Sequence, residues 1–110
     1  MKLTFKRLLI ASALVSATAL YAAPVAENWE NLCTKCHGAD GKGQTKTGKK
    51  LKVNDYTDAA VQAKLKDDEM AKAITDGVTT DGKERMKGFK DEISAPEITE
   101  LVAYIRKFKA

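Results

Sequence analysis

The chain has 110 residues, with 19 Lys and Arg, 15 Asp and Glu, one His and two Cys, and a formal net charge of +4. Three of the basic side chains, Lys2, Lys6 and Arg7, precede the first apolar run, and without them 16 basic side chains face 15 acidic ones. This near balance argues against a nucleic-acid-binding protein, and the remaining length is that of one small domain with a thin apolar core.

The first 23 residues have the features of a secretory signal peptide. A basic start is followed by a short apolar run, residues 8–20, and then by alanines. The run is shorter than the roughly 20 apolar residues that a membrane span needs, and it contains hydroxyl side chains. We therefore predict a signal peptide over residues 1–23, cleaved after Ala22 or Ala23, and an exported domain over residues 24–110 that keeps no membrane anchor.

The spacing of apolar side chains predicts a first helix from about Ala26 to the sequence CTKCH. One face of this helix carries residues three and four positions apart: Trp29, Leu32, Cys33 and Cys36. Glycines then interrupt a long polar stretch, residues 38–48, and favour a loop.

Two short helices are expected in the middle of the chain. One covers residues 58–65, and the other covers residues 67–76, with acids in its first turn and Gly77 just past its end. Residues 77–90 contain no sustained alternation of β-branched and polar side chains and no Asn-Gly turn. We therefore expect a loop there, and no strand anywhere in the chain.

The last helix has the strongest signals. Ser94 followed by Glu97 has the spacing of a capping box, and Pro96 suits a first helical turn. Apolar residues then form one stripe at helical spacing: Ile98, Leu101, Val102, Ile105 and Phe108. Such a stripe needs an apolar partner, and the first helix with Trp29 is the expected one.

Both cysteines and the only histidine lie within five positions, as Cys33-Thr34-Lys35-Cys36-His37. Cys-x-x-Cys-His is the attachment motif of haem c. Two cysteines three positions apart lie on the same side of a helical turn, where both sulfurs can form thioethers to the porphyrin while the adjacent histidine ligates iron. The motif therefore predicts one covalently bound haem.

Other uses of Cys33, Cys36 and His37 stay open beside haem. A structural zinc site needs four ligands, so a carboxylate would have to complete it. A thioredoxin-like dithiol needs a βαβ pattern, which is missing here. A simple disulfide would close only a tiny loop and stabilise little.

From NWENLCTKCHGADGKGQ to GKERMKGFKDEISAPEITELVAYIRKF, the chain resembles the small class I c-type cytochromes. The resemblance implies an all-α cytochrome c fold, with about four short helices wrapped around one covalently bound haem. It implies that Trp29 packs on Leu101 and Tyr104, where the terminal helices cross. It also implies that a methionine in the loop before the last helix, here Met86, is the sixth ligand of the iron.

The surroundings of the methionines favour the same choice. Met70 has Ile74 one turn later in an Ala-rich helical segment, which is typical of a core side chain. Met86 lies in a glycine-rich, charged segment with no apolar stripe to join, although packing within a loop stays open for it. The predicted iron ligands are therefore His37 and Met86, because a thioether is a suitable axial donor.

The sequence departs from the family's pattern at two places. Gly48-Lys49 stands where the family often has a Gly-Pro pair whose carbonyl orients the proximal histidine, although the carbonyl of residue 49 could still accept this hydrogen bond from His37. Lys87 stands where a proline often follows the ligand methionine, so a more mobile loop is expected around Met86.

A haem held by His and Met has no open position, and the resemblance implies electron transfer rather than catalysis. We therefore predict a monomeric, periplasmic shuttle of single electrons with a positive midpoint potential. Lysines after the motif either form an ordinary solvated face or steer an acidic redox partner: Lys42, Lys46, Lys49, Lys50 and Lys52. The alternatives are a permanently docked subunit of a dehydrogenase or oxidase, a haem sensor with an open sixth position, and a haem-free thiol oxidoreductase.

Overall fold

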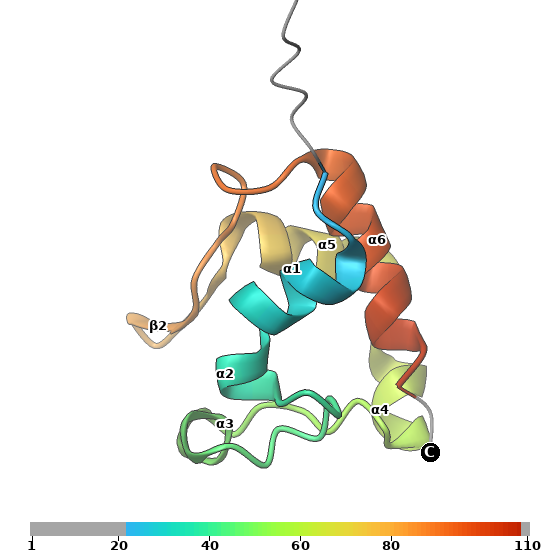
Figure 1. Cartoon of the computed structure of the whole chain (residues 1–110). Helices are drawn as coiled ribbons and strands as arrows, with labels where there is room; N and C mark the ends of the chain where they lie inside the picture. Colours follow the sequence, from blue (N-terminus) through green and yellow to red (C-terminus); the bar gives the residue numbers. More distant parts are fainter. Residues whose placement is uncertain (1–21, 109–110) are drawn as a thin grey trace, which may run out of the picture.

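The computed structural model describes residues 22–108, which Figure 1 shows as a set of short helices. The helices are α1 (Val25–Leu32), α2 (Thr34–His37), α3 (Lys46–Leu51), α4 (Ala59–Lys64), α5 (Asp67–Asp76) and α6 (Ala95–Arg106). Between α5 and α6, β1 (Val78–Thr80) and β2 (Lys83–Met86) pair as an antiparallel hairpin. This mostly helical architecture confirms the expected fold class. The predicted signal peptide falls almost wholly outside the described residues and stays a prediction.

The core lies where α1 and α5 pack against α6 (Figure 1). Leu101 is only 1% exposed, and it is surrounded by the buried apolar residues Trp29, Cys33, Met70, Ile74, Phe89, Ile93, Ile98, Val102 and Ile105. The Trp29 ring lies 5.5 Å from the Tyr104 ring and 4.9 Å from the Phe108 ring, centroid to centroid. The predicted crossing of the terminal helices is confirmed.

The helix ends follow the local sequence signals. In α6, the Ser94 hydroxyl accepts a hydrogen bond from the Glu97 N–H, and the Glu97 carboxylate accepts one from the Ser94 N–H, which completes the predicted capping box. The Asp58 carboxylate caps α4 through the Ala60 N–H at 2.8 Å. Gly77 ends α5 with φ of 81°, a conformation that favours glycine. No helix in residues 22–108 combines the length and apolar character that a membrane crossing requires.

The expected loop over residues 38–48 was partly wrong, because α3 begins within it. The Thr45 side chain accepts a hydrogen bond from the Gly48 N–H at 2.8 Å and caps this helix, and Lys52 ends it in the left-handed conformation. The signal that was missed is an ordinary threonine N-cap followed by residues with modest helix propensity.

The expectation of no strand was also wrong. β1 and β2 flank a two-residue turn in which Asp81 and Gly82 both have positive φ, 52° and 75°. This is the pattern of a type I′ turn, for which Asp-Gly serves as well as Asn-Gly. The hairpin ends at Met86, so the predicted ligand lies at the end of a strand, and the irregular segment begins only after it.

A buried polar contact joins α1 to α6. The Asn28 amide donates to the Glu97 carboxylate at 2.7 Å, and both residues are buried. This hydrogen bond, followed by the one from the Ser94 backbone, holds the pKa of Glu97 below its ordinary value of 4.5. Ionised Glu97 is therefore the form that the folded state prefers.

We predict that Glu97→Gln destabilises the protein at neutral pH and that its disadvantage shrinks in acid. A carboxyl group whose pKa is lowered on folding contributes stability above its unfolded pKa and loses it as pH falls through the folded pKa. Urea unfolding of both proteins at about pH 7 and about pH 3 measures this. A difference between the two proteins that is independent of pH would show that the charge of Glu97 contributes nothing.

Candidate functional site

A largely apolar cavity of about 600 Å³ opens beside the core. Cys33, Cys36 and His37 line it, and they come from the α1–α2 junction and α2. Met70 from α5 and Met86 from β2 line it too, together with core residues such as Trp29, Ile74, Phe89, Leu101 and Ile105. The structure thus brings all four predicted site residues to one cavity.

The motif folds as a single turn that is anchored on both sides. Cys33 breaks the helix between α1 and α2, and its carbonyl accepts a hydrogen bond from the His37 N–H at 2.9 Å. The Cys36 carbonyl accepts from the Thr45 hydroxyl at 2.7 Å. A Cβ on Gly48 would lie 2.3 Å from the Cys36 carbonyl oxygen. Only glycine therefore allows α3 to pack this closely against the motif.

The His37 imidazole is held by packing. Its ring lies 5.3 Å from the Tyr56 ring, nearly parallel at 25°, and 5.7 Å from Trp29. Burial lowers the pKa of His37, which favours the neutral imidazole that binds metals. Nδ1 is buried and has no hydrogen-bond partner among the described residues. The hydrogen bond that the carbonyl of residue 49 could accept from His37 is therefore absent, and the Lys49 carbonyl accepts instead from the Lys52 N–H.

The chemistry of the cysteines argues against the other uses of the motif. Both thiols are free, and burial, followed by the neighbouring Cys36, raises the pKa of Cys33 to about 12. Redox-active dithiols need the opposite shift, toward the thiolate. Within residues 22–108, no three His, Cys, Asp or Glu side chains are grouped to hold a metal ion. The zinc and dithiol alternatives receive no support.

The same residues fit a haem. The cavity is apolar and of the size that cofactor sites have. Its wall presents two free sulfurs from one turn, an imidazole that burial keeps neutral, and thioether side chains. Cys33 and Cys36 would hold the haem covalently, and His37 would supply an axial nitrogen to the iron.

Met86 and Met70 both reach the cavity, so its lining alone does not select one of them as the sixth ligand. Met70 is 7% exposed and belongs to the core cluster, as the sequence predicted, whereas Met86 is half-buried at the end of β2. The segment after Met86 is tied to the end of α5, because the Phe89 N–H donates to the Ile74 carbonyl at 2.8 Å. Met86 as ligand stays a prediction.

Gly77 fixes how closely the Met86 segment approaches α5. A Cβ at Gly77 would lie 2.5 Å from the Met86 carbonyl oxygen, whereas a Cβ at Gly82 would meet nothing within 4 Å. Both glycines have positive φ, 81° and 75°. Both positions therefore require a backbone conformation with positive φ, but only Gly77 lies in close contact with the Met86 carbonyl.

We expect Gly77→Ala to displace Met86 and Gly82→Ala to leave it in place. Each variant is expected to lose about 1–3 kcal/mol of stability to backbone strain. Only Gly77→Ala adds a clash, between the new Cβ and the Met86 carbonyl oxygen. Ferric and ferrous absorption spectra of the holoproteins report the loss of axial methionine ligation. Equal spectra for the two variants would show that the contact at Gly77 does not position the ligand.

The cavity lining includes more basic than acidic side chains. Lys35, Lys52, Arg85 and Lys87 line it, against one acidic residue, Glu69. Only Lys52 belongs to the predicted lysine cluster, so the basic side chains closest to the site come mostly from α2 and the hairpin region. Lys87 forms an ion pair with Glu92.

The chain is similar to one known protein family and to solved structures. The model of the family described as cytochrome c oxidase, cbb3-type, subunit III matches residues 21–105. Among solved structures, the KustC0563 c-type cytochrome is 32% identical with a TM-score of 0.69, and the match covers 77% of this chain and 96% of that one. A Tyr-to-Phe mutant of Kustc0563 is also 32% identical, with a TM-score of 0.67 over 77% of this chain and 98% of that one. No curated protein sequence matches the chain.

The family match spans nearly all of the described fold and includes the motif, the cavity and the closing helix. It carries with it the covalently bound haem c, for which the two cysteines have the required spacing, and a role in electron transfer. The chain therefore belongs to the cytochrome c family that this model describes, and it is a small monohaem class I c-type cytochrome.

Proposed function

We propose that this cytochrome is a periplasmic carrier that shuttles single electrons between redox proteins, with His37 and Met86 as the iron ligands. Haem iron supplies the one-electron chemistry by alternating between its ferrous and ferric states. Cys33 and Cys36 would keep the haem attached, and His37 and Met86 would occupy the iron positions at which a substrate could otherwise bind. This arrangement suits a carrier and not an enzyme.

The observation that carries the proposal is the polar surface of the domain. Within residues 22–108, Val78 is the only large hydrophobic side chain that is exposed, at 36%. Permanent subunit interfaces are large and resemble a domain core, whereas electron-transfer encounters are small and weak. The surface therefore favours transient docking.

The basic side chains at the cavity indicate which face of the domain a partner would contact. Lys35 and Lys52 are exposed, and they line the cavity that would hold the haem. A partner with acidic side chains around its own redox centre would be attracted to this face. The proposed partners are thus acidic redox proteins, and the encounter brings their centre close to the haem edge.

Charge reversal at the cavity tests the proposed docking face. We expect Lys35→Glu/Lys52→Glu to slow electron transfer to an acidic redox protein by about 10-fold or more at low salt, and the effect to fade as salt screens the charges. Lys46→Glu/Lys50→Glu has the same charge change at α3 positions that do not line the cavity, and a smaller effect is expected. Flash photolysis over a range of ionic strengths measures both rates.

Rates that do not depend on ionic strength would refute electrostatic docking, and equal effects of the two double variants would show that the docking face extends over the lysine cluster.

A permanently docked oxidase subunit is the second candidate, because the matching family's description names such a subunit. Gentle purification from the native membrane and periplasm separates the two functions. The carrier is expected to be free in the periplasmic fraction, and recovery only within an oxidase complex would favour the subunit.

A further inference from the structure

Tyr56 is the side chain that stacks on His37, and it lies in an irregular segment between α3 and α4. Its ring lies 5.3 Å from the imidazole at 25°, and it also meets the edge of the Trp29 ring at 6.5 Å. No helix or strand ladder holds this part of the chain. Other contacts must therefore fix the Tyr56 ring.

Two hydrogen bonds fix the backbone of Tyr56. Its N–H donates to the Gly41 carbonyl at 2.9 Å. Its carbonyl accepts from the Gln62 side-chain amide at 2.7 Å, and the same amide nitrogen donates to the Ile105 carbonyl at 2.9 Å. Gln62 thus connects the Tyr56 segment to the end of α6.

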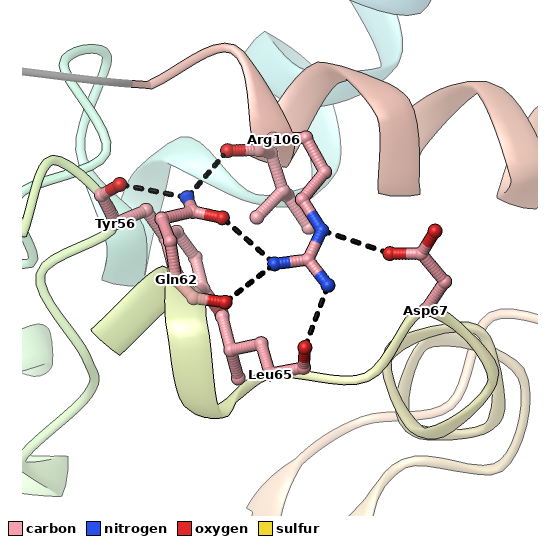
Figure 2. A network of polar contacts seen from close by, with 6 residues as sticks. Tyr56, Gln62, Leu65, Asp67 and Arg106 are labelled. Carbon is pink, nitrogen blue, oxygen red and sulfur yellow. Dashed lines mark hydrogen bonds and ion pairs between the residues drawn. The ribbon is translucent and has the colours of Figure 1, made fainter. Parts of the chain in front are cut away.

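Arg106 holds Gln62 in the orientation that these bonds require (Figure 2). Its guanidinium donates to the side-chain oxygen of Gln62 at 3.0 Å and to the backbone carbonyls of Gln62 and Leu65 at 2.7 and 2.6 Å. A further bond reaches the Asp67 carboxylate at 2.8 Å. Because the side-chain oxygen of Gln62 accepts from Arg106, the side-chain nitrogen of Gln62 is the atom that faces the Tyr56 carbonyl and donates to it.

The imidazole lacks the usual second support. Metal-bound histidines generally donate their other N–H to a carbonyl or carboxylate, which sets the orientation of the ring. His37 Nδ1 has no such partner in residues 22–108. Rotation of this ring is therefore limited by packing, and Tyr56 provides its nearly parallel neighbour.

We infer that Gln62 and Arg106 are positioning residues for the haem site: through Tyr56 they set the angle of the His37 imidazole plane. The inference rests on His37 being the iron ligand, as proposed above. The angle of an axial imidazole controls its overlap with the iron orbitals, so it belongs to the levers by which a protein tunes a haem. Gln62 and Arg106 do not line the cavity, whereas Tyr56 and His37 do, so the two residues would act on the iron ligand through Tyr56.

The test uses ferric holoprotein and the paramagnetically shifted haem methyl resonances in NMR spectra, whose pattern depends on the orientations of the axial ligands, including the angle of the imidazole plane. Gln62→Met and Tyr56→Leu are both expected to change the pattern, and the double variant is expected to change it no further than Tyr56→Leu alone. Asp67→Asn is the matched control, because Arg106 keeps its bonds to Gln62 and Leu65. It is expected to preserve the pattern.

A second substitution guards against a folding failure. Gln62→Glu keeps an acceptor for Arg106 but loses the donor to Tyr56, so the same spectral change is expected without removal of the polar contact at Arg106. An unchanged pattern in a folded Gln62 variant would overturn the inference, even if the variant unfolds more easily. A wild-type spectrum without imidazole ligation would instead refute His37 as ligand, which distinguishes the two failures.

Discussion

Replacing Cys33 and Cys36 together by alanine is expected to abolish covalent haem and to leave the chain without a cooperative fold. The haem would fill a largely apolar cavity of about 600 Å³. Without haem, water would contact the apolar walls of this cavity, at a cost of about 25 cal/mol for each Å² of apolar surface, and a small domain has a total stability of only about 5–15 kcal/mol. The apoprotein should therefore collapse or unfold.

Haem retention after acid extraction and urea unfolding followed by circular dichroism measure the two effects. Lys35→Ala is the control, because it changes a residue inside the motif without removing a sulfur. It should keep the haem and a cooperative transition. A colourless double variant that still unfolds cooperatively would show that the polypeptide core suffices alone.

The parts of the fold that follow local rules were predictable. The capping box of Ser94 and Glu97 and the backbone freedom of Gly77 act within one turn, so these residues predicted where α6 begins and where α5 ends. Asp58 caps α4 at the start of the helix expected over residues 58–65. The apolar stripe of α6 packs against Trp29 of α1, because a small domain buries the apolar faces of its helices against each other. The Cys-x-x-Cys-His motif is just as local, since one helical turn carries all of its chemistry.

The parts that depend on distant contacts were not predictable. α3 is short and weak by propensity, and its place depends on Gly48 meeting the Cys36 carbonyl, a contact between two separate segments. The hairpin differs, because its signal is local: the Asp81-Gly82 pair forms the same type I′ turn as the Asn-Gly pair that the sequence lacks. The role of Tyr56 was not predictable, because nothing near it in the sequence indicates that its ring stacks on His37.

The choice between two methionines shows the same limit. Helical periodicity assigned Met70 to the core, which the structure confirms, but the core here is also the wall of the cavity. A side chain can therefore be buried and still face the haem. Burial and periodicity separate core from surface, whereas ligation depends on direction, which a sequence pattern does not contain.

Met86→Ala is expected to lower the midpoint potential by on the order of 100 mV or more, because the choice of axial ligands moves haem potentials over about 0.8 V. A thioether favours ferrous iron, and water in its place would favour the ferric state. The open position should also let carbon monoxide bind the reduced protein rapidly. Redox titration and a carbon monoxide binding assay measure these changes.

Met70→Leu is the matched control, because it removes the other thioether from the same cavity with little change in volume. Such an exchange should cost less than about 1.5 kcal/mol in stability and leave the potential close to that of the wild type. A large fall in potential for Met70→Leu, with Met86→Ala nearly unchanged, would make Met70 the ligand. Rapid carbon monoxide binding by the unmodified protein would show that neither methionine ligates, and it would revive the sensor function. The two variants thus decide which methionine ligates the iron, and carbon monoxide binding by the unmodified protein decides between a carrier and a gas-binding protein.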